Sequence, residues 1–182
     1  HRGVRDTGGR VALAMFACRK PIVGAINGAA VGIGATMTLP MDFRFASEKA
    51  RIGFVFGRLG ITPEACSTWF LPRIVGLRRA QELILTNRRL SAEEALEWGL
   101  LTRVVEDAEL GAEAEKLAAQ IAAGPTGAYG AVKKLLASTF DSTLETQMEL
   151  EGAAIAAAAI SRDGREGVAA FLGKRAPVFG GI

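Results

Sequence analysis

The chain has 182 residues, of which 49% are hydrophobic and 23% charged, so it can form one globular core and is too apolar for a disordered segment. Its formal net charge is +3, and its Lys and Arg residues are dispersed. This charge pattern argues against nucleic-acid binding and suits an anionic small molecule. No apolar run is long enough to span a bilayer, the single His stands at position 1, and Cys18 and Cys66 lack metal-ligand spacing. We therefore expect a cytoplasmic protein with reduced thiols, no membrane segment, no metal site and no His-based triad.

The first half of the chain predicts alternating helices and strands. Apolar residues recur at helical spacing before Pro21, which ends a helix, and a short β-branched run after it predicts a buried strand. The predicted elements are a helix over 10–20, a strand over 22–26, a glycine-rich turn over 27–34, a helix over 35–39 and strands over 43–45 and 51–55. This order predicts an α/β layout with a right-handed crossover.

The second half predicts mainly helices. Thr62, Pro63 and Glu64 are typical of a helix start, and Pro125 is expected in the first turn of a later helix. Ser91 and Glu94 have the spacing of a capping box. Further helices are predicted over 77–86, 144–160 and 165–171, and one more strand over 101–105.

The glycine-rich turn contains Gly32, Ile33 and Gly34, directly before a predicted helix. Unpaired N–H groups at a helix start, next to glycines that let a ligand approach, favour binding of a phosphate or of an enolate oxygen. A dinucleotide site is excluded, because Met37 occupies the third glycine position and residues 52–54 hold no acid. A tight turn that merely needs small residues explains the same pattern.

Glu64 also has two interpretations. As an acid in the first turn of a helix it would stabilise the helix dipole by a few tenths to about 1 kcal/mol. As a carboxylate among apolar neighbours such as Ile61 and Trp69, it is a candidate general base. The residue types alone leave both interpretations open.

Four segments share their residues and their order with one known protein family. They are residues 20–34 (KPIVGAINGAAVGIG), 51–54 (RIGF), 90–101 (LSAEEALEWGLL) and 171–179 (FLGKRAPVF). These segments resemble the motifs of the crotonase superfamily, which contains the enoyl-CoA hydratases and isomerases, and the resemblance extends from about residue 10 to residue 179.

The resemblance implies a crotonase-type ββα spiral with a helical C-terminal region. Residues 1–105 would form the later part of the spiral and residues 106–182 the region that builds a homotrimer or a dimer of trimers. The substrate would be an acyl-CoA thioester, with no separate cofactor because coenzyme A is part of the substrate. Two main-chain N–H groups would bind the thioester oxygen. One would belong to Ile33, and the other to strands that precede His1 in a longer protein.

The resemblance also indicates the reaction. The two glutamates of the hydratases correspond to Thr36 and Phe56, neither of which is a carboxylate. Glu64 stands where the enoyl-CoA isomerases have their catalytic glutamate, so isomerisation with Glu64 as acid/base is expected. Two alternatives are hydration of a 2-enoyl-CoA and a non-catalytic protein that binds acyl-CoA.

The expected binding residues complete this prediction. Residues expected to line the substrate site are Gly32, Gly34, Thr36, Phe56, Leu59, Pro63 and Trp69. The family's coenzyme A contact corresponds to Phe171 and Lys174, whose ammonium would suit a phosphate.

Overall fold

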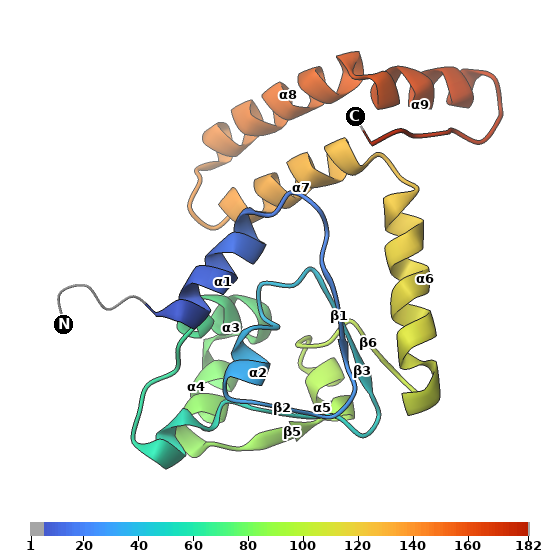
Figure 1. Ribbon diagram of the computed structural model, residues 1–182. Helices are drawn as coiled ribbons and strands as arrows, with labels where there is room; N and C mark the ends of the chain where they lie inside the picture. The colour runs from blue at the N-terminus through green and yellow to red at the C-terminus, as the bar shows by residue number, and fades with distance from the viewer. Residues whose placement is uncertain (1–5, 182) are drawn as a thin grey trace. The chain divides into compact units, whose positions relative to one another are not determined.

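The computed structural model describes residues 6–181, which divide into two compact units (Figure 1). The first unit contains the chain up to Ala17 together with Ile22–Glu115, and the second contains Cys18–Pro21 and the chain from Lys116 onward. The division falls within α6 (Leu110–Ala122), because the first turns of that helix bury apolar side chains with the first unit. The predicted boundary at residue 105 between the spiral and the oligomerisation region stays a prediction.

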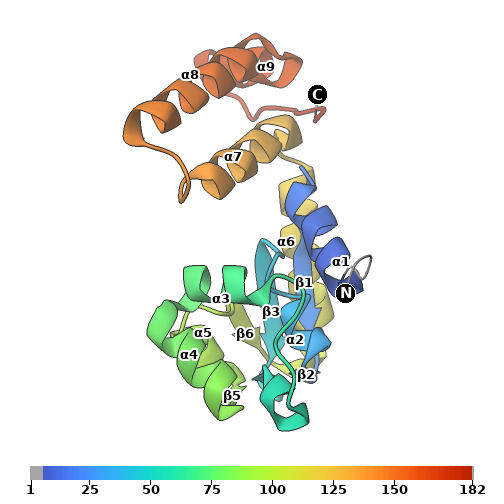
Figure 2. The same ribbon diagram turned by 90° about the vertical axis from the view of Figure 1, so that its left-hand side faces the viewer.

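The first of two sheets is parallel, with strand order β1-β3-β6. β1 (Val23–Ile26) pairs with β3 (Phe43–Ser47), which in turn pairs with β6 (Arg103–Val105) (Figure 2). Parallel neighbours need a crossover connection, and the glycine-rich segment and α2 (Ile33–Thr36) lie in the connection between β1 and β3. The predicted α/β class is confirmed.

The second sheet has the order β2-β4-β5. β2 (Ala29–Val31) pairs parallel with β4 (Arg51–Gly53), and β4 pairs antiparallel with β5 (Arg89–Ser91). The prediction of a turn throughout residues 27–34 was wrong at β2. Residues 29–31 form a strand because they pair with β4, which lies more than 20 residues further along the chain. The predicted strand over 51–55 ends at Gly53, where the 3₁₀ helix η1 (Val55–Leu59) soon follows.

The longer helices of the first unit agree more closely with their local signals. α1 covers Thr7–Ala17, and α4 covers Leu77–Thr86 as predicted. α5 (Ala92–Glu97) begins with the predicted capping box, in which the Ser91 hydroxyl accepts the Glu94 N–H at 3.2 Å. The core of this unit consists of apolar side chains from both sheets and from these helices, the largest being Ile52, Phe54, Leu71, Leu83, Leu90 and Leu100.

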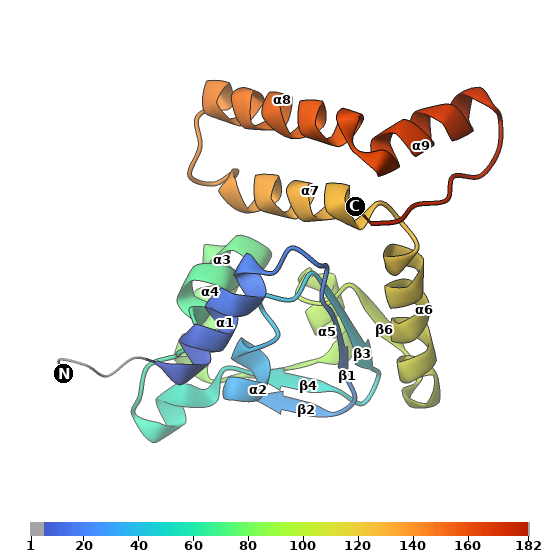
Figure 3. The same ribbon diagram turned by 45° about the horizontal axis from the view of Figure 1, so that its top comes forward.

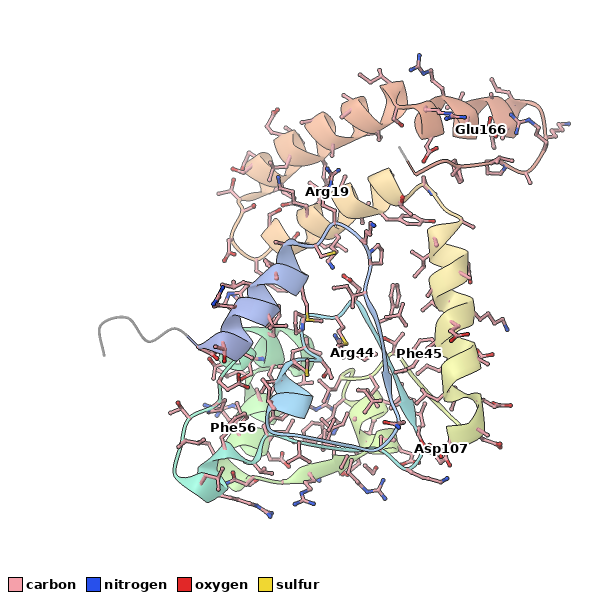
Figure 4. The ribbon with its side chains drawn as sticks, viewed as in Figure 1. Arg19, Arg44, Phe45, Phe56, Asp107 and Glu166 are labelled. Atoms are coloured by element: carbon pink, nitrogen blue, oxygen red, sulfur yellow. The ribbon has the colours of Figure 1, made fainter. Side chains whose placement is uncertain are left out.

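A buried arginine anchors three segments of the first unit. The Arg44 side chain on β3 points into the interior (Figure 4), where its Nε donates to the Leu100 carbonyl at 2.6 Å. Its Nη1 donates to the carbonyls of Met41 at 2.5 Å and Leu39 at 3.2 Å. Burial lowers the pKa of Arg44 from its usual value, and nearby Asp42 opposes that shift. The guanidinium thus satisfies main-chain carbonyls that the short helix α2 and the loop before β6 leave without partners.

The second unit is helical. α7 (Thr126–Ser138) and α8 (Leu144–Ile160) run side by side, and α9 (Arg162–Leu172) follows (Figure 3). The segment after α9 returns along it. Glu166 on α9 binds the Arg175 guanidinium at 2.6 and 2.8 Å and accepts the Val178 N–H at 2.8 Å.

Candidate active site

The glycine turn has a main-chain conformation that requires glycine. Gly32 adopts φ +59° and ψ −123°, a region that is essentially closed to residues with a Cβ atom. Its N–H donates to the Gly53 carbonyl at 3.0 Å, and its carbonyl accepts the N–H groups of Ala35 and Thr36. These bonds attach the turn to β4 and start α2 directly after it.

The turn leaves main-chain donors accessible. Within residues 6–181, no hydrogen bond uses the N–H of Ile33 or of Gly34. A Cβ atom added at Gly32 or Gly34 would meet no other atom within 4 Å, so the space beside the main chain is open. Free N–H groups in open space at a helix start are suited to binding a negatively charged oxygen.

Glu64 does not begin a helix, contrary to the sequence prediction. α3 (Ser67–Val75) starts three residues later, and no acidic residue lies in its first turn. Ala65 and Cys66 interrupt the helix, because both are left-handed, with φ of +56° and +57°. Left-handed conformations cost a residue with a side chain roughly 1–2 kcal/mol each. Glu64 therefore does not stabilise the dipole of α3. The left-handed turn at Ala65 and Cys66 separates its carboxylate from that helix.

The carboxylate of Glu64 lies against α2. The Thr36 hydroxyl donates to Glu64 Oε1 at 2.5 Å, across 28 residues of sequence. Thr36 is one residue of the short helix that begins at Ile33, so this bond brings the carboxylate to the glycine turn. The structure thus brings together three of the predicted site residues, Ile33, Thr36 and Glu64.

The first turn of α1 covers the other side of Glu64. A Cβ atom added at Gly8 would lie 2.0 Å from Glu64 Oε2 and 2.9 Å from Ile33 Cδ1, so any side chain there would displace these two atoms. Asp6, just before α1, accepts the Ala65 N–H at 2.7 Å and also contacts the Glu64 side chain. The Ala65 N–H, and then the N–H groups in the first turn of α1, lower the pKa of Asp6 below its usual range.

Sequence reasoning missed Asp6 and Gly8. A signal was present, because Asp6 precedes a helix whose first turn contains Gly8 and Gly9, and glycine is unfavourable in helices by about 1 kcal/mol. Two adjacent glycines in a helix suggest a close approach by another group. The identity of that group depended on a contact 56 residues away along the chain, which no local pattern reveals.

Four more of the predicted site residues lie in the first unit, in or after η1. Phe56 is buried, with 8% of its surface exposed (Figure 4), whereas Leu59 is 76% exposed. Pro63 is half-buried. Trp69 packs edge-on against Phe16 of α1 at 5.4 Å between ring centroids. Their role in lining a substrate site stays a prediction.

The two predicted coenzyme A residues belong to the second unit. Phe171 is 82% exposed at the end of α9, and Lys174 follows it with a left-handed main chain, φ +48°. Within the described residues no cluster of three or more His, Cys, Asp or Glu side chains is arranged to hold a metal ion. None of the helices between residues 6 and 181 has the length and apolarity to cross a bilayer.

Comparison with known proteins defines the family. A family model described as enoyl-CoA hydratase/isomerase matches residues 4–181. The 1,2-epoxyphenylacetyl-CoA isomerase of Escherichia coli (strain K12) is 43% identical over 162 residues, which are 89% of this chain and 62% of that protein. Enoyl-CoA hydratase ACTT3 of Alternaria alternata is 42% identical over 178 residues, 96% of this chain and 60% of that protein.

A solved structure gives the same result for the fold. The enoyl-CoA hydratase/isomerase from Cupriavidus metallidurans CH34 superposes with a TM-score of 0.90 at 35% identity, covering 97% of this chain and 66% of that chain. The chain therefore belongs to the enoyl-CoA hydratase/isomerase family and has its crotonase-type fold. It spans about 60% of the length of the curated relatives described above.

Proposed function

We propose that the protein acts on an enoyl-CoA thioester and moves its double bond, with Glu64 as the acid/base. The observation that supports this is the Thr36–Glu64 hydrogen bond of 2.5 Å, which brings a single carboxylate to the open glycine turn. Family membership supports the acyl-CoA substrate. Relatives of similar identity are named as an isomerase and as a hydratase, so the proposal of isomerisation rests on the single carboxylate at the turn.

The reaction needs one carboxylate and an oxyanion donor. The Ile33 N–H would donate to the thioester oxygen, together with the second main-chain donor that the resemblance implies. Glu64 would remove a proton from the carbon between the thioester and the double bond of a 3-enoyl-CoA, which leaves a dienolate with its charge on the thioester oxygen. Glu64 would then return the proton to the far end of the dienolate, giving the 2-enoyl-CoA. Each oxyanion donor contributes about 2.7–4 kcal/mol to such a reaction.

The binding surfaces follow from the resemblance. Gly32 and Gly34 would let the thioester approach the main chain, and their open surroundings support this. The predicted lining residues Phe56, Leu59, Pro63 and Trp69 would contact the acyl chain. Phe171 and Lys174 would contact coenzyme A in a homotrimer or a dimer of trimers.

The test replaces Glu64 by Gln, which keeps the shape and the acceptor oxygen but removes the base. Conversion of a 3-enoyl-CoA to the conjugated 2-enoyl-CoA should fall by about 10²–10⁴-fold. Glu97→Gln, the same change at an exposed position on α5, is the matched control and should keep full activity.

Three outcomes would contradict the proposal. Undiminished isomerisation by Glu64→Gln would remove Glu64 as the base. Formation of a 3-hydroxyacyl-CoA from a 2-enoyl-CoA, without isomerisation, would identify a hydratase. Tight acyl-CoA binding with no turnover of either substrate would identify a non-catalytic member of the family.

A further inference from the structure

We infer that Thr36 is a positioning residue for Glu64, holding its carboxylate through Oε1 in the orientation that proton transfer requires. This inference rests on the proposed role of Glu64 as the acid/base. The hydrogen bond from the Thr36 hydroxyl to Glu64 Oε1 is present whatever that role is. It joins α2 to the left-handed turn before α3.

The Thr36 hydroxyl has one proton and two acceptors within reach. The Ile33 carbonyl lies at 3.3 Å, which is the usual back-bonding contact of a threonine within a helix, and Glu64 Oε1 lies at 2.5 Å. The shorter contact is in the range of charge-assisted O–H···O⁻ bonds, and the longer one exceeds the usual limit for a hydroxyl. The proton therefore points at Glu64 and not at its own helix.

Burial makes this hydroxyl a fixed donor. Thr36 is 0% exposed, so its hydroxyl donates from within the protein and not from the solvent-exposed surface. The neighbouring residues Ala35 and Leu39 are part of the hydrophobic core, which holds α2 in place. In the described part of the chain, no Lys or Arg forms an ion pair with Glu64. Among the residues that the structure describes, the hydrogen bond from Thr36 is thus the contact that holds Oε1.

The first turn of α1 restricts the Glu64 carboxylate from the other side. Asp6, just before this helix, contacts the Glu64 side chain and accepts the Ala65 N–H at 2.7 Å. A Cβ atom added at Gly8 would lie 2.0 Å from Glu64 Oε2, so the carboxylate has little room to turn. The carboxylate is thus held from two sides, by Thr36 on Oε1 and by the first turn of α1 against Oε2.

Two substitutions separate the hydroxyl from the shape of the side chain. Thr36→Val keeps the branched shape and removes the donor, whereas Thr36→Ser keeps the donor. We expect Thr36→Val to lower kcat by about 10- to 100-fold, as for the loss of a hydrogen bond to a charged group, with KM changed less than about twofold. Thr36→Ser should recover most of the lost kcat.

The ¹³C chemical shift of the Glu64 carboxyl group, compared between variants at one pH, tests the contact without turnover. The shift should change in Thr36→Val, which lacks the donor, and return in Thr36→Ser, whether or not Glu64 is the base. Full activity of Glu64→Gln would remove the proposed function alone. Wild-type kcat together with an unchanged carboxyl shift in Thr36→Val would overturn the positioning role, as would a failure of Thr36→Ser to recover kcat in a variant with normal thermal stability.

Discussion

Replacement of Gly8 by alanine should separate the activity of this protein from its stability. The added Cβ atom would lie 2.0 Å from Glu64 Oε2, and a carbon–oxygen contact needs more than 3 Å, so the carboxylate must move by about 1 Å. A movement of that size lengthens the 2.5 Å bond from Thr36 beyond hydrogen-bonding distance. A misplacement of about 1 Å can cost about 10²-fold in rate, and that is the loss of kcat we expect.

The fold should tolerate the same change. Alanine is favoured over glycine within a helix by up to about 1 kcal/mol, and the atom that must move is the end of a flexible side chain. Gly111→Ala is the matched control, since Gly111 is also the second residue of its helix, α6, and a Cβ there meets nothing within 4 Å. Turnover of a 3-enoyl-CoA and thermal unfolding would be measured for both variants. A Gly8→Ala protein as active as Gly111→Ala would refute the reasoning.

Two further predictions concern the fold. Arg44→Met should destabilise the first unit by about 3 kcal/mol in urea unfolding, because two buried carbonyls and one partly buried carbonyl lose their donor. Exposed Arg78→Met is the control, and equal stability of the two variants would contradict the prediction. Arg175, and then the Val178 N–H, lower the pKa of Glu166 to about 2, below its ordinary value of 4.5. The contacts of Glu166 with the C-terminal segment should therefore persist above about pH 4.5 and be lost as the pH falls toward 2. The NMR shift of the Val178 amide should titrate with a midpoint near pH 2. A midpoint near 4.5 would show that the contact is not formed.

The protein's sequence determined those elements whose signals are local. The helices over 77–86 and 144–160 have the predicted bounds, and the capping box at Ser91 forms as its spacing indicates. Each of these depends on residues within a few positions of one another, so the main-chain geometry follows from the residue types. The motifs were also sufficient for the family, because their order along the chain is itself sequence information.

Only the tertiary structure decided how the candidate site is assembled. Ala65 and Cys66 take left-handed conformations that no residue pattern favours, and burial of Ala65 with its bond to Asp6 offsets their cost. Thr36 and Glu64 meet across 28 residues, and Gly8 and Glu64 across 56. Such contacts form only when the core has closed, because the cost in chain entropy of bringing distant segments together is met by burial of side chains elsewhere. The sequence therefore identified Glu64 as a candidate base, and the fold alone supplied the hydroxyl, the glycine and the second carboxylate that surround it.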